Sequence, residues 1–245
     1  MIKLKNHPFA VEAFFEKSII LTYAFPKKTL EKLIPKCVEL DTFQDKFAFI
    51  AVALVQTKNL RPKGLPAFMG NNFTLIGFRI FVRYTNSKGR KLRGLYILKS
   101  ETDKKKMEFF GNIFTHYNYG TTDLSIKKSG EEFHVNSKKS NIKIELIQKG
   151  IDSVLPENSP FKDWKEARRF AGPMPFTFTF DESKNEVLII EGVRSNWKPE
   201  PLEIVSESVV FFEEKNLKGG IPANAFIVEN IPYYWKKGRI EKWNP

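Results

Sequence analysis

The stretch Phe47-Ala48-Phe49-Ile50-Ala51-Val52-Ala53-Leu54 is apolar at every position. Strands that are buried on both faces read as unbroken apolar runs, although the periodicity alone would also allow a helix. We interpret this run as a strand that is covered by apolar side chains on both faces.

Strand patterns also dominate the sequence on either side of this run. Residues 176–180 alternate strictly between Phe and Thr, which predicts a buried Phe face and a half-exposed Thr face. A polar, glycine-containing loop separates the apolar runs 78–84 and 92–100, which predicts a hairpin. Further strands are predicted over residues 17–24, 121–127, 132–136, 142–148, 187–193, 206–212 and 226–228.

Helical spacing of apolar residues is confined to residues 26–34, 104–114 and 160–171. We therefore expect a mainly β fold with at least ten strands and about three helices. No stretch is long or polar enough to mark a linker, so residues 1–245 are expected to form a single domain. The longest irregular stretch, residues 59–72, carries apolar side chains. We expect it to share a concave site with the strands over 78–84 and 92–100.

The charge balance is strongly basic, with 40 Lys and Arg against 28 Asp and Glu, or 40 − 28 = +12. The lysines are scattered and many flank turn glycines, which indicates solvated hairpin tips. Specific nucleic-acid binding is therefore not expected, and a non-catalytic protein that binds nucleic acid or an acidic partner is the weakest alternative. No segment reaches the roughly 18 apolar residues of a spanning helix, so we expect a cytoplasmic protein without a membrane partner. A homo-oligomer is left open.

The familiar catalytic patterns are missing. The sequence holds no nucleophile elbow, phosphate-binding loop, dinucleotide fingerprint or zinc-protease motif, and we expect no cofactor. Its three histidines are too dispersed to indicate a metal site. The single cysteine, Cys37, allows no internal disulfide, and we expect it to be a buried structural thiol.

The most chemically suggestive segment is the strand that contains Lys99. Regular alternation would place Leu95, Ile97, Lys99 and Glu101 on one face, with Lys99 and Glu101 roughly 7 Å apart. If that face lined a cavity, desolvation would lower the pKa of Lys99, and Glu101 could move protons. A neutral amine is what Schiff-base chemistry on an oxo acid requires. The alternative is a strand end where Lys99 reaches water and pairs with Glu101.

Candidate substrate-binding residues lie on and beside the same predicted hairpin. Arg79 alternates with apolar residues and could hold a carboxylate through its guanidinium group, with Arg83 as its partner. A face of exposed, stacked charges is equally consistent with this alternation. We add Tyr96 and His116 as further substrate-binding candidates.

Four stretches resemble elements of the YqjF-like family, within the acetoacetate-decarboxylase-like superfamily, and they run in the family's order. They are residues 30–43 (LEKLIPKCVELDTF), 60–66 (LRPKGLP), 78–84 (FRIFVRY) followed by Gly94-Leu95-Tyr96, and 197–202 (WKPEPL). The resemblance implies strongly curved antiparallel sheets that form a barrel-like cavity, with a few helices outside.

The resemblance also implies limits on the chemistry. Acetoacetate decarboxylases use a Lys-Lys pair, which would fall near residues 110–113, where this chain has no lysine. Their first-strand arginine would fall near Tyr23 and Ala24 and is also absent. We expect a cavity for a small acidic or carbonyl-containing metabolite. A lyase or decarboxylase that uses Lys99 is the alternative, and whether the protein is an enzyme stays open.

Overall fold

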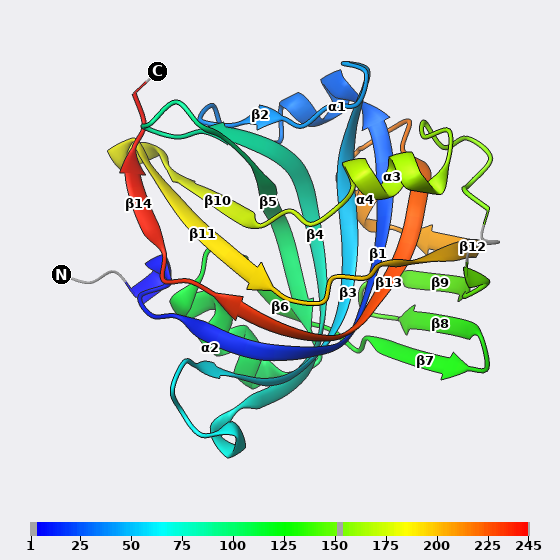
Figure 1. Cartoon of the computed structure of the whole chain (residues 1–245), viewed down its shortest axis with the longest axis horizontal. Helices are drawn as coiled ribbons and strands as arrows, with labels where there is room; N and C mark the ends of the chain where they lie inside the picture. The colour runs from blue at the N-terminus through cyan, green and yellow to red at the C-terminus, as the bar shows by residue number, and fades with distance from the viewer. Residues whose placement is uncertain (1–3, 151–153, 245) are drawn as a thin grey trace.

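The computed structural model describes residues 4–150 and 154–244, which fold around a strongly curved sheet (Figure 1). Its strand order is β14-β11-β10-β5-β4-β3-β1-β13-β12-β9-β8-β7, with β2 beside β4 and β6 beside β5. The strands are β1 (Val11–Pro26), β2 (Glu39–Leu40), β3 (Phe47–Pro62), β4 (Asn71–Thr85), β5 (Lys91–Thr102), β6 (Tyr119–Thr121), β7 (Ser125–Ser129), β8 (Glu132–Ser137), β9 (Ile142–Ile147), β10 (Phe176–Asp181), β11 (Glu186–Arg194), β12 (Glu200–Val209), β13 (Ile221–Trp235) and β14 (Arg239–Lys242). The helices are α1 (Lys27–Glu31), α2 (Lys105–Phe114), α3 (Trp164–Phe170) and α4 (Phe211–Glu214), with short 3-10 turns η1 (Leu4–Asn6), η2 (Ala67–Met69) and η4 (Glu182–Lys184). The predicted mainly β fold is confirmed.

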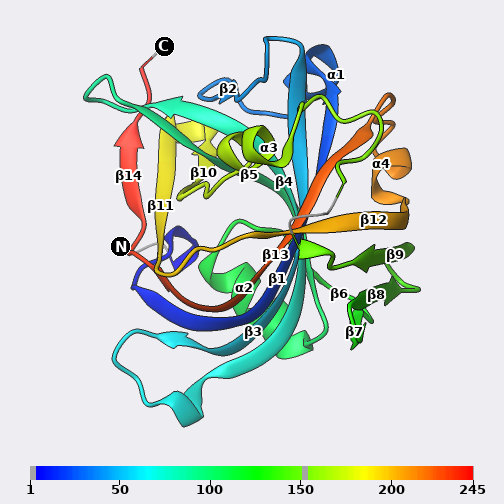
Figure 2. The same cartoon turned by 45° about the vertical axis from the view of Figure 1, so that its right-hand side comes forward.

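The curvature of the sheet brings β11 and β13 together, although several strands separate them in the strand order. A short antiparallel pairing between β11 and β13 completes a ring through β1, β3, β4, β5, β10, β11 and β13 (Figure 2). The sheet is mixed rather than purely antiparallel, because β5 pairs in parallel with both β10 and β6. A parallel neighbour requires a long connection, and the segment from 103 to 175 between β5 and β10 provides it.

The central strand β3 separates two apolar layers, as its unbroken apolar run predicts. Ile50, Val52 and Leu54 point into the larger core, on the convex face, where β8, β9 and α4 pack. Phe49 and Ala51 point to the concave face, into a second core beneath α3. Both faces of the strand are therefore buried, which confirms the interpretation of this run.

The strands extend well beyond their apolar runs. β3 continues to Pro62 and β4 begins at Asn71, so the two ends of the stretch predicted as irregular over 59–72 are strand, while residues 63–70 form a loop that contains η2. Backbone pairing between strands extends them past their apolar runs, since even polar residues such as Glu12 and Arg61 are paired across β1 and β3. Similarly, the strand predicted over 206–212 ends at Val209 and is followed by α4.

Cys37 is buried in the larger core. Burial raises the pKa of its thiol to about 11, so the sulfur is protonated at neutral pH and is a poor nucleophile. This burial confirms the structural position expected from the sequence. Separately, none of the helices described for 4–150 and 154–244 is long and apolar enough to cross a membrane.

Candidate functional site

A cavity of about 570 Å³ lies within the curved sheet. Strands β1, β3, β4, β5, β10, β11 and β13 and helix α2 all contribute side chains to its wall. Among its lining residues there is no Asp or Glu, whereas the cationic side chains are Arg61, Arg79, Lys106 and Arg194. Arg61 is paired with Glu12 at 2.6 Å. The cavity wall therefore carries an excess of positive charge.

Arg79 projects into the cavity from the middle of β4. Its Nε is buried and has no acceptor among the described residues. Burial, followed by the nearby Arg194, lowers the pKa of Arg79, while Tyr233 and the other nearby phenols oppose that shift. A guanidinium group keeps its proton in a protein, so Arg79 presents a buried positive charge. Gly77 allows this position, because a Cβ there would lie 2.9 Å from Arg79 Nε.

Arg194 reaches the same cavity from the last residue of β11. Its guanidinium carbon lies 4.6 Å from the ring centroid of Trp197 and 5.5 Å from that of Tyr233. Arg194 Nη1 donates a hydrogen bond to Tyr233 Oη at 3.3 Å. Its Nη2 is buried without an acceptor in the described structure. Two aromatic rings thus hold the guanidinium group in place while part of it remains unpaired.

Three tyrosines lie beside these arginines. The hydroxyl of Tyr117 is 2.9 Å from Thr177 Oγ1, and burial raises its pKa to about 12. Burial, followed by the effect of Tyr117, also raises the pKa of Tyr119. The hydroxyl of Tyr233 occupies space that a side chain at position 192 would fill, so glycine is required there. Neutral phenols can donate hydrogen bonds to an anion, and they complete a polar group within the cavity.

The structure brings together the segments that were predicted to share a concave site. Leu60 and Met69 from the 59–72 stretch, Arg79 from β4, and Ile97 and Ser100 from β5 all line the cavity. Of the candidate site residues predicted from the sequence, Arg79 alone is among the lining residues.

Lys99 and Glu101 share a face, but it is not the face of Leu95 and Ile97. In the β4–β5 register Arg79 pairs with Ile97 and Phe78 pairs with Lys99, which leaves Leu98 as an extra, unpaired residue. This bulge reverses the alternation, so Ser100 lines the cavity and Lys99 does not. Lys99 Nζ instead lies 2.9 Å from Glu101 Oε1, with 37% of the lysine side chain exposed. The regular alternation predicted over residues 95–101 was therefore wrong, and the catalytic role of Lys99 and Glu101 stays a prediction.

Tyr96 and His116 also lie outside the cavity wall. Tyr96 packs against the larger core, and burial followed by the effect of Cys37 raises its pKa. His116 lies between two lining residues, Thr115 and Tyr117, but its Nε2 is 3.2 Å from Asn6 Oδ1. The geometry therefore gives these two predicted substrate-binding residues no position on the cavity wall. Their role stays a prediction.

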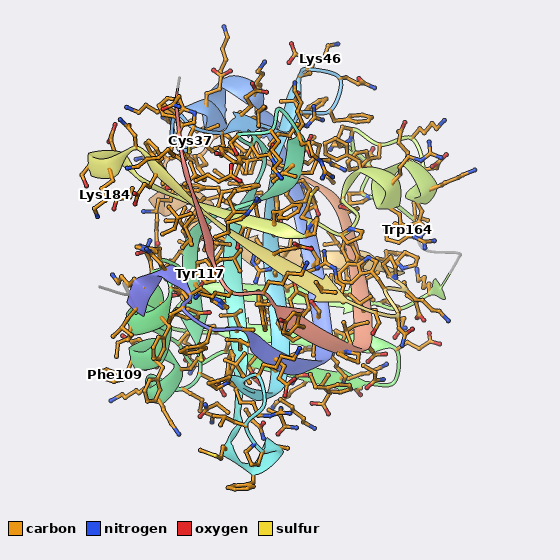
Figure 3. The ribbon with its side chains drawn as sticks, turned by 60° about the vertical axis from the view of Figure 1, so that its left-hand side comes forward. Cys37, Lys46, Phe109, Tyr117, Trp164 and Lys184 are labelled. Carbon is orange, nitrogen blue, oxygen red and sulfur yellow. The ribbon has the colours of Figure 1, made fainter. Side chains whose placement is uncertain are left out.

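Sequence reasoning missed Arg194 and the three tyrosines. Arg194 lies just before residues 197–202, which resemble an element of the family. That position was the signal in the sequence that could have indicated Arg194 as a site residue. Tyr233 is 39 residues from Arg194 and carries no local signal of their contact. Figure 3 places Tyr117 in the body of the molecule, whereas Phe109 and Lys184 lie at its edge.

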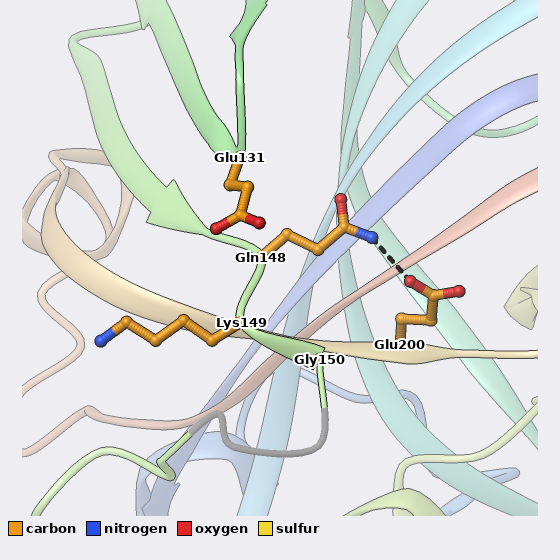
Figure 4. Close-up of a pocket in the computed structure, with 5 residues that line it drawn as sticks. All are labelled: Glu131, Gln148, Lys149, Gly150 and Glu200. Carbon is orange, nitrogen blue, oxygen red and sulfur yellow. Dashed lines mark hydrogen bonds between the residues drawn. The ribbon is translucent and has the colours of Figure 1, made fainter.

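A second depression is a weaker candidate. It lies beside β8, β9 and β12 and is lined by Glu131, Gln148, Lys149, Gly150 and Glu200 (Figure 4). Gln148 donates a hydrogen bond to Glu200 at 2.6 Å, and Lys149 pairs with Glu203 at 2.8 Å. Gln148, Lys149 and Glu200 thus already have polar partners within the protein. Within the described ranges, no cluster of three or more His, Cys, Asp or Glu could hold a metal ion.

The architecture is the acetoacetate-decarboxylase-like fold, here with a cationic cavity inside it. An acetoacetate decarboxylase from Legionella pneumophila aligns with a TM-score of 0.63 and 11% identity, over 96% of this chain and 88% of that chain. An acetoacetate decarboxylase-like enzyme from Sphingomonas wittichii RW1 aligns with a TM-score of 0.59 and 10% identity, over 98% and 94%. The enduracididine biosynthesis enzyme MppR, complexed with pyruvate, aligns with a TM-score of 0.57 and 8% identity, over 97% and 92%. At these identities the likeness concerns the fold.

The chain belongs to the DUF2071 family of uncharacterized conserved proteins, whose profile matches residues 13–231. The predictions of an uncharacterised family and of the acetoacetate-decarboxylase-like fold are therefore confirmed. A search of curated proteins finds no significant match.

Proposed function

We propose that this protein binds a small organic acid in its cavity, with the carboxylate held by Arg79 and Arg194. The observation that carries the proposal is the unpaired charge. Both guanidinium groups line the cavity with a buried N–H that lacks an acceptor, and no carboxylate side chain is among the lining residues. A buried charge without a partner is costly, and an anionic ligand would remove that cost.

The chemistry of the site favours a carboxylate over other anions. Planar guanidinium groups match the two oxygens of a carboxylate, and neutral phenols add single hydrogen bonds. Tyr117 and Tyr233 are placed to provide such bonds from the same cavity. MppR, which has this fold, binds pyruvate, an organic acid, and this supports the same ligand class here.

Substitution of either arginine tests the proposal. We expect Arg79→Gln and Arg194→Gln each to weaken the binding of pyruvate, hexanoate or benzoate by about 10- to 150-fold. This range corresponds to the roughly 1.5–3 kcal/mol contributed by a hydrogen bond to a charged group. Calorimetric titration of each acid into the wild type and the variants measures the change. Arg90→Gln, in the exposed β4–β5 hairpin loop, is the matched control and should leave affinity unchanged.

A stability measurement separates a binding role from a structural one. Without ligand, Arg79→Gln should unfold at the same temperature as the wild type or higher, because it removes an uncompensated buried charge. If Arg79→Gln lost stability and bound the acids normally, Arg79 would be structural and the proposal would be wrong. Failure of every acid to bind the wild type would also contradict it.

A different experiment tests the Schiff-base alternative. We expect borohydride reduction with a panel of 2- and 3-oxo acids to trap no adduct on Lys99, because its amine is paired with Glu101 and lies off the cavity wall. Among the lining residues the single lysine is Lys106, which is exposed on α2. Peptide mass mapping of the reduced protein checks this. An adduct on Lys99 that disappears in Lys99→Ala would show that the pair opens and that the lyase hypothesis holds.

A further inference from the structure

Most of the cavity wall is apolar. Away from the arginines and tyrosines, aliphatic and aromatic side chains from several strands and α2 line it, including Val55 and Leu60 of β3, Phe73 and Leu75 of β4, and Met107 and Phe114 of α2. The volume of about 570 Å³ falls in the range of about 300–1,000 Å³ typical of sites that enclose drug-sized ligands. The cavity therefore offers far more apolar surface than an acid such as pyruvate could cover.

Strand β4 shows how the polar and apolar parts are arranged. Arg79, Leu75 and Phe73 all line the cavity and lie on the same face of this strand. At about 3.3 Å per residue, Leu75 is about 13 Å and Phe73 about 20 Å from Arg79 along the strand. The Arg79 guanidinium group thus lies at one level of the cavity, and the apolar side chains of Leu75 and Phe73 lead away from it towards η2. At that end, Arg61, which is paired with Glu12, and Lys106 also line the cavity.

The cavity reaches the surface between η2 and α2. Of its lining residues, Met69, Lys106 and Phe110 are the exposed ones, and they belong to these two elements. Phe68 and Phe109 stand beside them, with exposed fractions of 86% and 63%. Figure 1 shows the η2 loop and α2 at the same end of the molecule, and Figure 3 shows Phe109 at its outer edge. Exposed large apolar residues of this kind typically mark a binding surface or an entrance.

We propose that the ligand is an organic acid with an extended apolar body, such as a medium-chain carboxylate, which enters between η2 and α2. This inference rests on the proposed function, because Arg79 and Arg194 hold the carboxylate. The apolar body would lie along Leu75 and Phe73 and cover surface that a short acid would leave in contact with water. Burial of this surface provides the main gain in affinity.

A series of straight-chain carboxylates from butyrate to decanoate tests the inference by calorimetric titration. We expect affinity to rise about fourfold for each added methylene, which is the gain that about 0.8 kcal/mol per buried methylene implies. Primary alcohols of the same lengths should bind much more weakly at every length, because they lack the charge. Equal affinity for butyrate and decanoate, both dependent on Arg79, would overturn the inference and leave the proposed function intact. Binding of acids without dependence on Arg79 or Arg194 would overturn both.

Variants of the apolar wall provide an independent readout. Leu75→Phe adds bulk about 13 Å along β4 from Arg79, and we expect it to weaken decanoate binding at least tenfold while butyrate binding is unchanged. Val55→Phe, opposite Leu75 in the β3–β4 register, should do the same and serves if Leu75→Phe fails to fold. Leu75→Met, which conserves volume, is the matched control. Unchanged decanoate affinity in the folded bulky variants would show that no chain occupies this part of the cavity.

Discussion

Phe49→Ala is expected to lower the free energy of unfolding by about 3–5 kcal/mol, the range for loss of a fully buried Phe side chain. The ring is completely buried and lies at the centre of an aromatic cluster in the second core. Its centroid is 4.9 Å from that of Phe170, 5.5 Å from Phe161 and 5.9 Å from Phe81. Replacement by Ala removes these contacts and leaves a void that rigid neighbouring strands fill poorly.

Urea denaturation measured by fluorescence or circular dichroism gives the size of this effect. Phe109→Ala is the matched control, since Phe109 is exposed on α2, and its substitution should change stability by less than about 0.5 kcal/mol. Equal stability of the two variants would contradict the position of Phe49 in the core. The second core also packs against the concave face of the sheet next to the cavity. We therefore expect Phe49→Ala to increase the mobility of the neighbouring end of the site.

Asp41→Asn is expected to lower the free energy of unfolding by about 3 kcal/mol, as loss of one partner from a buried ion pair does. Asp41 is fully buried and accepts from Arg93 Nε at 2.6 Å, while its other oxygen contacts Arg83 Nη2. Arg83 and Arg93 lie directly opposite each other across β4 and β5, where like charges repel. Asn would leave both positive charges uncompensated. The two arginines are partly exposed, which places the effect near the lower end of the range for buried pairs.

Thermal and urea unfolding of Asp41→Asn can be compared with Asp45→Asn. Asp45 also forms an ion pair, with Lys27 at 2.7 Å, but its side chain is 81% exposed. Exposed pairs contribute about 0–1 kcal/mol, so this control should change little. An effect of Asp41→Asn no larger than that of Asp45→Asn would show that the buried cluster contributes little to stability. This cluster also explains why Arg83 is not the partner of Arg79 at the site, since its guanidinium group is committed to Asp41.

The position of Arg79 could be anticipated from the sequence because alternation is a local property. Phe78 and Ile80 flank Arg79, so burial of one face of β4 requires the arginine to lie on the other. The same logic accounts for β3, whose apolar run has no polar face, and for the alternation of β10. In each case, neighbouring residues alone carry the information.

The alternation failed in β5 because a bulge depends on the partner strand. Nothing in the order Ile97-Leu98-Lys99 marks Leu98 as the residue without a partner, and the register with β4 decides it. That single extra residue moved Lys99 off the cavity wall and put Ser100 in its place.

The sequence by itself determined that this is a mainly β protein with a doubly buried central strand and an arginine on the face of β4 opposite Phe78 and Ile80. Tertiary structure alone decided which groups meet that arginine. Arg194 and Tyr233 come together because β11 pairs with β13 and completes the ring, and Tyr117 arrives on the segment that follows α2. The physical reason is that local patterning reports which face of a strand is buried. Ring closure and register instead depend on the summed free energy of contacts between segments far apart in the chain, which no local pattern displays.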